Sequence, residues 1–292
     1  MIEDRETIAV LCRGSQYYRV FHGNMHEAVC MHSCAKPFQL LPVLEAGLEK
    51  TYQLTQDELA FMVSSHLGQD EHIAVFYSII QKTGLREDEL ILPATAPQGR
   101  IAHSLWLDRQ EPLRKCYHPC SGNHLAMMLA NREKTGSPTG YERRDSFVQK
   151  RIGELLLQFA DAAPPDMIVT TDYCGVPAFS LPAYQISNLY RRLARESSTD
   201  ERIHALVTAA GRYPRMIEGD GCIATILNSQ PGIFAKTGFG GLIAGSLLNE
   251  ELGFVIKSSY GWKVAVDVLI SCLSELHLLT PKLVCELKEC FI

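Results

Sequence analysis

Strand-like segments lie near both ends of this chain, while its middle shows the residue spacing of helices. Short apolar runs bounded by turn residues predict strands at 8–12, 17–21, 232–236, 242–247 and 252–257, with two further ones at 26–31 and 167–170. Segments so far apart in the sequence have to meet in one layer if they form a single sheet. We therefore expect an α+β fold, in which an antiparallel sheet with flanking helices is built from both termini.

The 292 residues are expected to form a single compact unit of two lobes, because the chain shows no internal repeat and no linker. The α/β lobe is predicted from residues 1–50 and 230–292, and a mainly helical lobe from residues 51–229. A cleft between two such lobes is the natural place for a binding site.

A capping box at Thr55-Gln56-Asp57-Glu58 predicts a helix that delivers Ser64-Ser65-His66 at its C-terminal end. Apolar spacing, caps and Gly stops predict further helices at about 38–47, 70–84, 123–134, 143–159, 183–195, 200–210, 263–276 and 281–289. Segments 92–99 and 171–177 are interpreted as loops.

The composition is that of a soluble globular enzyme, with 46% hydrophobic and 21% charged residues. The formal net charge of -5 provides no basic field for nucleic acid, and no apolar run is long enough for a membrane helix. Four of the first six residues are charged, unlike a secretory signal, so we expect a cytoplasmic protein. Its ten scattered cysteines are then expected to be reduced thiols or metal ligands.

Ser33 and Lys36 stand three residues apart where an apolar helix is expected to begin. One helical turn brings their side chains onto the same face. A serine hydroxyl is a weak nucleophile at neutral pH, and a lysine amine kept neutral by burial or by other cations can accept its proton. This spacing makes Ser33 a candidate nucleophile and Lys36 its base, although a helix-capping serine beside a solvated lysine has the same spacing.

Two later stretches support the catalytic interpretation. Ser121-Gly122-Asn123 contains S-x-N, and Lys236-Thr237-Gly238 is a literal K-T-G that closes an apolar run. The order S-x-x-K, S-x-N, K-T-G is typical of serine β-lactamases and penicillin-binding proteins. Such a site needs a nucleophile at a helix start, a polar wall from a loop, a lysine on a strand, and backbone N–H groups that stabilise an oxyanion.

The chain also resembles the L-asparaginase II family of the Rhizobium etli type, whose members are similar in fold to serine β-lactamases and glutaminases. The stretches that carry the resemblance span nearly the whole sequence in the family's order: 33–39, 64–68, 118–122, 172–177 and 235–238. The resemblance implies an amidohydrolase that converts the side-chain amide of L-asparagine, or a related small amide, to the acid and ammonia through a serine acyl-enzyme.

The resemblance further implies two serine–lysine pairs, Ser33 with Lys36 and Ser65 with Lys236. Substrate contacts are expected from neighbouring motif residues, namely His66, Ser121, Asn123, Asp172, Thr237 and Gly238.

A zinc site beside the serines is implied as well, with Cys120 and Cys174 as thiolate ligands. The sequence departs from the family at Asn123, which offers a neutral amide where the family has a lysine. We therefore expect Zn²⁺ to be held weakly or not at all, and no organic cofactor. The expected partners are a small amide substrate and a second copy in a homodimer, without nucleic acid or membrane.

Two other function classes stay open on the sequence. One is a β-lactamase-like or peptidase-like acyl enzyme, which the missing export signal disfavours. The other is a diverged homologue, either a biosynthetic acyl-transfer enzyme or a catalytically inactive binding protein, which the departure at Asn123 allows.

Overall fold

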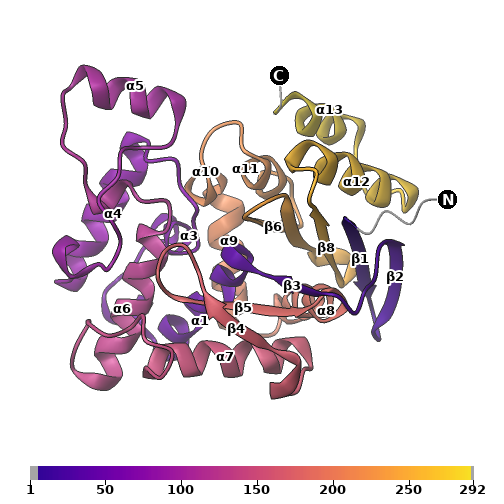
Figure 1. The fold of residues 1–292 in the computed structure, drawn as a ribbon, viewed down its shortest axis with the longest axis horizontal. Helices are drawn as coiled ribbons and strands as arrows, with labels where there is room; N and C mark the ends of the chain where they lie inside the picture. The colour runs from indigo at the N-terminus through magenta and orange to yellow at the C-terminus, as the bar shows by residue number, and fades with distance from the viewer. Residues whose placement is uncertain (1–5, 291–292) are drawn as a thin grey trace.

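The first and last strands of the chain share one antiparallel sheet in the computed structural model, which describes residues 6–290. The five strands of this sheet stand in the order β2-β1-β8-β7-β6 (Figure 1). Their bounds are Thr7–Arg13 for β1, Tyr17–His22 for β2, Ile233–Gly238 for β6, Leu242–Leu247 for β7 and Leu252–Ser258 for β8. The α+β fold with a sheet made from both termini, predicted from the strand positions, is confirmed.

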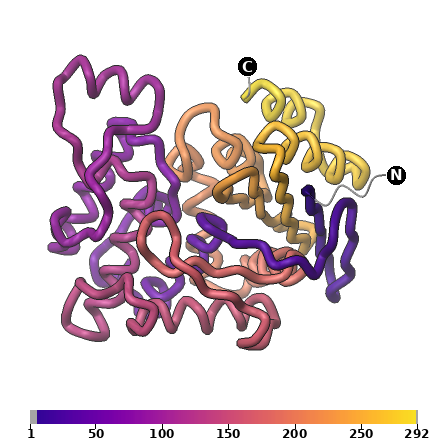
Figure 2. The backbone as a smooth tube through the Cα atoms, viewed as in Figure 1, coloured from indigo at the N-terminus to yellow at the C-terminus, as the bar shows by residue number. Residues whose placement is uncertain are grey.

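The two ends of the chain meet at the pairing of β1 with β8, in which Val10 lies opposite Val255. Side chains on a strand alternate between the two faces of a sheet. Accordingly Ala9 packs with helix α12 (Trp262–Glu275) on one face, and Val10 belongs to the core on the other. Helix α13 (Pro281–Glu289) joins α12, and the β1 and α13 ends of the chain lie on the same side of the molecule (Figure 2).

Helix α8 (Ala183–Glu196) covers the opposite face of the sheet and packs on β1, β7 and β8. Its close approach depends on Gly253 of β8, because a Cβ at this position would overlap the backbone of Ser187 and Arg191. The sheet is thus a middle layer between two layers of helices.

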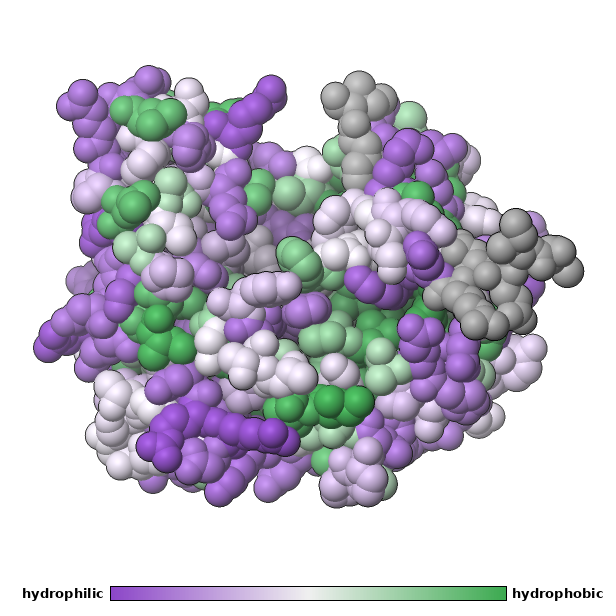
Figure 3. All heavy atoms as spheres, in the orientation of Figure 1, coloured by the Kyte–Doolittle hydropathy of each residue, from purple (hydrophilic) through white to green (hydrophobic). Residues whose placement is uncertain are grey.

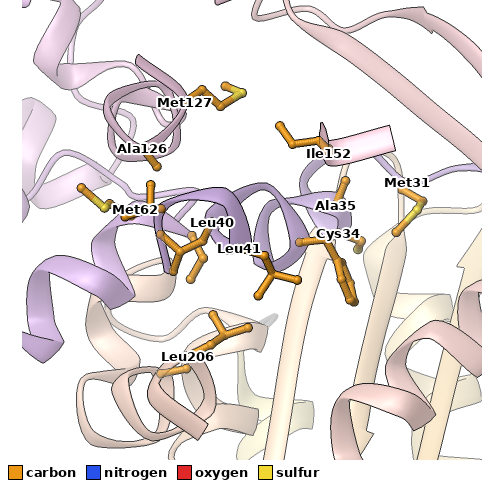
Figure 4. Packing of buried hydrophobic residues seen from close by; sticks show 14 of the residues in the cluster. Met31, Cys34, Ala35, Leu40, Leu41, Met62, Ala126, Met127, Ile152 and Leu206 are labelled. Carbon is orange, nitrogen blue, oxygen red and sulfur yellow. The ribbon is translucent and has the colours of Figure 1, made fainter. Parts of the chain in front are cut away.

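Helix α1 (Lys36–Glu45) lies at the centre of the helical part, with nearly all of its residues buried. Figure 4 shows Leu40 and Leu41 of α1 among Ala126 and Met127 of helix α6 (Ser121–Thr135) and Leu206 of helix α9 (Glu201–Arg212). The remaining helices are α2 (Leu48–Thr51), α3 (Gln56–Met62), α4 (Asp70–Thr83), α5 (Arg100–Asp108), α6 (Ser121–Thr135), α7 (Phe147–Ala160), α9 (Glu201–Arg212), α10 (Pro214–Ile217) and α11 (Ile223–Asn228).

A small second sheet was only partly predicted. Its order is β3-β5-β4, with β3 at Ala28–Cys30, β5 at Pro177–Pro182 and β4 at Ile168–Thr171, and both pairings are antiparallel. The sequence predicted β3 and β4 but not β5. Proline stands at both ends of β5 and signals a chain break, while the pairing that makes it a strand is long-range.

Helix bounds differ from the prediction in places. Helix α7 begins at Phe147 and not at 143, because the Ser146 hydroxyl accepts a hydrogen bond from Gln149 N and caps the helix there. Helices α2, α5, α10 and α11 were not predicted. The capping box at Thr55 is present, and α3 ends before Ser64-Ser65-His66 as expected.

The division into lobes at residues 50 and 230 stays a prediction. Helix α8 comes from the predicted helical lobe yet packs on the sheet, and β3 comes from the predicted α/β lobe yet pairs with β5. Figure 3 shows a face of mostly hydrophilic and intermediate residues, on which hydrophobic side chains form small separate groups. Within residues 6–290, no helix combines the length and the apolar character that crossing a bilayer requires.

Candidate active site

The S-x-x-K stretch forms a short 3-10 helix, His32–Ala35, that leads directly into α1. Three contacts fix this turn. Tyr190 Oη donates to Cys34 O at 2.8 Å, Cys34 Sγ donates to Lys236 O at 3.2 Å, and a Cβ at Gly238 would lie 2.9 Å from Met31 O. The half-buried Ser33 is therefore carried on a turn packed against the K-T-G strand.

The Lys36 amine lies in the interior of the site, with 3% of the residue exposed. Its Nζ donates to Ser64 O at 2.5 Å, to Ser65 Oγ at 3.1 Å and to Cys120 Sγ at 3.3 Å. Among the described residues, no hydrogen bond joins Lys36 to Ser33. The structure thus brings Lys36 to the second serine of the implied pairs.

Lys236 is fully buried on β6 and faces the same side of the sheet as Phe234, two residues earlier. Its Nζ donates to Thr237 O at 3.1 Å and lies 3.6 Å from Glu218 Oε1. Burial lowers the pKa of Lys236, Glu218 opposes this shift, and the charge of Lys36 adds to it. In the described part of the chain no hydrogen bond links Lys236 to Ser65, so that implied pair stays a prediction.

Sequence reasoning missed Glu218. The segment that carries it runs alongside the Ser65 loop, because Ser65 N donates to Ile217 O at 2.8 Å and Leu67 N donates to Glu218 O at 2.9 Å. Glu218 Oε2 also accepts from Ala224 N at the start of α11, at 3.1 Å. No spacing in the sequence singles out Glu218 within Glu218-Gly219-Asp220-Gly221, because its contact with Lys236 forms only when the chain is folded.

His66 and Ser121 form a buried support below these groups. Gly68 N donates to His66 Nδ1 at 3.0 Å, so the proton lies on Nε2, which donates to Ser121 Oγ at 2.8 Å. Ser121 in turn donates to Cys116 O at 3.1 Å. Burial lowers the pKa of His66 well below its usual value, which keeps the ring neutral. Both residues were expected to contact substrate, and in this structure their polar atoms bind each other.

The start of α6 reaches the Ser65 loop because residue 122 is glycine. A Cβ at Gly122 would overlap the carbonyl oxygen of Phe61. The next residue, Asn123, is 1% exposed, and its Nδ2 has no hydrogen-bond partner within the described residues. An unpaired buried donor is costly, so Asn123 is a candidate to donate to a substrate oxygen.

Cys120 and Cys174 are joined by a hydrogen bond between their side chains. This bond lowers the pKa of the Cys120 thiol, and the charge of Lys36 lowers it further, whereas burial raises it. The net pKa lies well below the usual value. The pKa of Cys174 is raised by the same bond and by burial. Cys120, the thiol whose pKa is lowered, has its Sγ 3.3 Å from Lys36 Nζ.

Asp172 closes the site from the β4–β5 loop. Its Oδ1 accepts from Tyr173 N at 2.7 Å and from His32 Nδ1 at 3.2 Å. The hydrogen bond to Asp172 raises the pKa of His32 to about 9, so this ring is an imidazolium at neutral pH. The exposed rings of Tyr173 and Phe239 lie over His32, with centroids 6.3 and 5.8 Å from it. His32 was not predicted as a site residue.

The five motif stretches are therefore gathered in one place. A hollow of about 860 Å³ near the C-terminal end of α8, lined by Gln16, Arg191 and Arg195 among others, contains none of their residues.

The family model described as L-asparaginase II matches residues 2–291, almost the whole chain. The chain belongs to the L-asparaginase II family. This membership supports an amidohydrolase activity, and it confirms the resemblance inferred from the motifs. No curated protein matches the sequence.

Two solved structures show the fold that this L-asparaginase II chain shares, and a third is similar at a lower TM-score. It is similar to a crystal structure of Mglu, with a TM-score of 0.52 and 14% identity over 94% of this chain and 68% of that one. Mglu in its native form has a TM-score of 0.50 at 14% identity, over 96% of this chain and 67% of that one. A probable glutaminase, ybaS, has a TM-score of 0.43 at 15% identity, over 87% of this chain and 77% of that one.

The zinc site that the family resemblance implies does not fit the residues of this chain. A structural zinc takes four ligands and a catalytic one takes three from the protein. Here the thiol of Cys120 contacts that of Cys174 and the amine of Lys36, and position 123 offers a neutral amide in place of the family's lysine. In the part of the chain that the structure describes, no group of three His, Cys, Asp or Glu side chains is placed to hold a metal.

Proposed function

We propose that this protein hydrolyses the side-chain amide of L-asparagine, or of a closely related small amide, through an acyl-enzyme on Ser33. The observation that carries this proposal is the buried Lys36 amine, three residues after Ser33 in the chain, whose Nζ donates to Ser65 Oγ. A lysine confined in this way is suited to proton transfer, which an exposed lysine is not.

In the proposed reaction, Ser33 Oγ attacks the amide carbonyl while its proton passes to the Lys36 amine. The hydrogen bond of 3.1 Å between Lys36 and Ser65 then offers a path by which Ser65 delivers a proton to the departing nitrogen. Ammonia leaves, and water hydrolyses the ester with the same groups in reverse roles. Hydrogen bonds of this kind tighten only when substrate is bound, so the missing Ser33–Lys36 bond does not oppose the scheme.

Lys236 has a different task in this proposal. Burial and the charge of Lys36 lower the pKa of Lys236, so its amine loses a proton more readily than that of an exposed lysine. Thr237 and Gly238 bring the end of β6 against the Ser33 turn. Asn123 Nδ2 and the Asp172 carboxylate are proposed to bind the polar groups of the substrate.

Two further proposals concern zinc and the oligomeric state. We propose that zinc is at most weakly held, so elemental analysis of protein purified without chelator is expected to find less than one zinc per chain after dialysis.

A cytoplasmic homodimer is proposed as well. Light scattering is then expected to give twice the chain mass of 32.6 kDa.

The function is tested by measuring ammonia release from L-asparagine and L-glutamine beside turnover of the β-lactam nitrocefin. We expect ammonia release and no nitrocefin turnover. Ser33→Ala is expected to reduce the rate by about three orders of magnitude or more. The matched control is Ser198→Ala, an exposed serine far from the motifs, which should be fully active. Nitrocefin turnover without ammonia release would support the β-lactamase-like alternative, and near-normal activity of Ser33→Ala would reject Ser33 as nucleophile.

A further inference from the structure

The hollow of about 860 Å³ near the C-terminal end of α8 lies apart from the proposed active site. Its volume falls in the range of small-molecule sites, roughly 300–1,000 Å³. The charged side chains that line it are three arginines of α8 and three acidic residues, namely Arg191, Arg192, Arg195, Asp161, Glu196 and Glu251. The ion pairs among them decide which charges are left for a ligand.

Arg192 is paired within the wall of the hollow. Its Nη2 lies 2.6 Å from Glu196 Oε1, and its Nη1 lies 3.8 Å from Asp161 Oδ1. The Asp161 carboxylate also accepts a hydrogen bond from Gln16 Nε2 at 2.8 Å. The charges of Arg192, Glu196 and Asp161 therefore already have protein partners.

Arg191 is a buried guanidinium without an acidic partner. The residue is 2% exposed, and its Nε donates to Asn188 Oδ1 at 2.8 Å while its Nη1 donates to Gly14 O at 2.7 Å. Both acceptors are neutral, and in the described part of the chain no carboxylate lies within ion-pair distance of Arg191. A buried charge is costly when no opposite charge compensates it. An anion bound in the hollow would supply that compensation.

Arg195 and Glu251 are the two other unpaired charges. Arg195 follows Arg191 by one helical turn, so the two side chains share a face of α8. Within residues 6–290, neither the Arg195 guanidinium nor the Glu251 carboxylate has a hydrogen bond or an ion pair. Gly14 ties Glu251 to this place, because Gly14 N donates to Glu251 O at 3.2 Å while Gly14 O binds Arg191. The hollow thus presents two unpaired guanidinium groups and one unpaired carboxylate.

We propose that this hollow is a binding site for an acidic amino acid. Arginine binds carboxylates through two parallel hydrogen bonds, so Arg191 and Arg195 each take one carboxylate of the ligand. Glu251 pairs with the ligand's ammonium group. A dicarboxylate without an amine would leave Glu251 unpaired, and an amino acid with one carboxylate would leave one arginine unpaired. The proposal uses no residue of the proposed active site and does not depend on amide hydrolysis.

The site is located by hydrogen–deuterium exchange of the unaltered protein with L-aspartate as the probe. L-Aspartate is also the product of the proposed hydrolysis, so the readout has to separate two places in the molecule. We expect slower exchange in segments 191–199 and 249–252, whether or not the motif stretches are protected as well. Protection confined to the motif stretches 33–39 and 64–68 would overturn this proposal while it supported the proposed function. An unchanged exchange pattern would overturn this proposal too.

Variants then test the charges, with the dissociation constant of the hollow read from exchange in the same segments. Arg195→Gln is expected to raise that constant for L-aspartate about tenfold, because one charge-assisted pair is lost. Both Arg195 and Glu251 are exposed and unpaired, so neither substitution removes a contact of the folded protein. Arg212→Gln, at an exposed arginine of α9, is the matched control and should leave binding unchanged.

Glu251→Gln separates the ammonium contact from the carboxylate contacts. It is expected to raise the dissociation constant for L-aspartate about tenfold and not to raise that for succinate, which has two carboxylates and no amine. Equal weakening of both ligands by Glu251→Gln would overturn the assigned role of Glu251 and with it the choice of an amino acid. Unchanged L-aspartate binding in Arg195→Gln would overturn the site as proposed.

Discussion

Two buried amines determine the chemistry of the site at the residue scale. Lys36 has three acceptors around its Nζ, whereas Lys236 has the Thr237 carbonyl and the more distant Glu218 carboxylate. A buried charge is costly unless it is paired and hydrogen-bonded. Lys236 has fewer partners to stabilise a buried charge, and burial lowers its pKa.

Glu218 is expected to set the acid limb of the pH–rate profile. Its carboxylate raises the pKa of Lys236, so Glu218→Gln should lower that pKa and leave the amine neutral at more acidic pH. The acid limb of kcat/KM for ammonia release is therefore expected to move to lower pH. Glutamine keeps an oxygen that can accept the hydrogen bond from Ala224 N, so the variant changes charge more than shape.

Glu133→Gln, at an exposed position on α6, is the control for this experiment and should leave the profile in place. An acid limb that does not move in Glu218→Gln would show that Lys236 does not control the ionisation that limits the rate.

Motif residues could be placed from the sequence because each stretch is locally defined. The Ser33 turn, the Ser65 loop and the Lys236 strand are all found together. Which serine contacts Lys36 could not be predicted, because that depends on the path of the loop after α3. Glu218 and His32 were missed for the same reason, because Glu218 acts on Lys236 of β6 and His32 pairs with Asp172, both through contacts that form only in the folded chain.

Close packing between elements holds the site together at the next scale. The start of α6 lies against the end of α3 with only a hydrogen at Gly122 between them. Gly122→Ala is expected to push α6 away and to lower the free energy of unfolding by about 3 kcal/mol, as overpacking against backbone does. Urea unfolding measures this change, and ammonia release should fall with it because Asn123 and Cys120 move.

Gly211 provides the contrast for this prediction. It lies within α9, and a Cβ there would meet nothing within 4 Å. Gly211→Ala is expected to stabilise the protein by about 1 kcal/mol through helix propensity. Similar effects of the two substitutions would contradict the packing argument.

Elements with strong local signals were predicted well. The capping box marked α3, and Pro281–Glu289 was predicted with the bounds of α13. Strand β5 and helix α5 were not predicted, because β5 is short and proline-flanked and α5 buries only Ala102. Their positions depend on tertiary contacts that no local pattern contains.

At the scale of the whole molecule, buried histidines link folding to pH. Burial lowers the pKa of His72 to about 4 and that of His124 to about 3, from an ordinary value of 6.5. Below pH 6.5 the unfolded chain binds protons that the folded chain does not, so stability present above pH 6.5 is lost as the pH falls toward 4. The free energy of unfolding is expected to decrease steadily over this window.

His72→Gln is expected to make this decrease shallower, because one of the groups that bind protons only on unfolding is removed. His103→Gln, at an exposed histidine, should leave the slope as it is. A stability that is constant from pH 6.5 to 4.5 would be inconsistent with neutral buried histidines.

The central claim is that Ser33 forms the covalent bond to the substrate. It is tested most directly by labelling the protein with a diazoketone analogue of L-asparagine and mapping the adduct by peptide mass spectrometry. The account predicts one label per active chain, on Ser33, and none in Ser33→Ala or in the presence of excess L-asparagine. A label on Ser65 or on a cysteine, or normal ammonia release by the labelled protein, would contradict it.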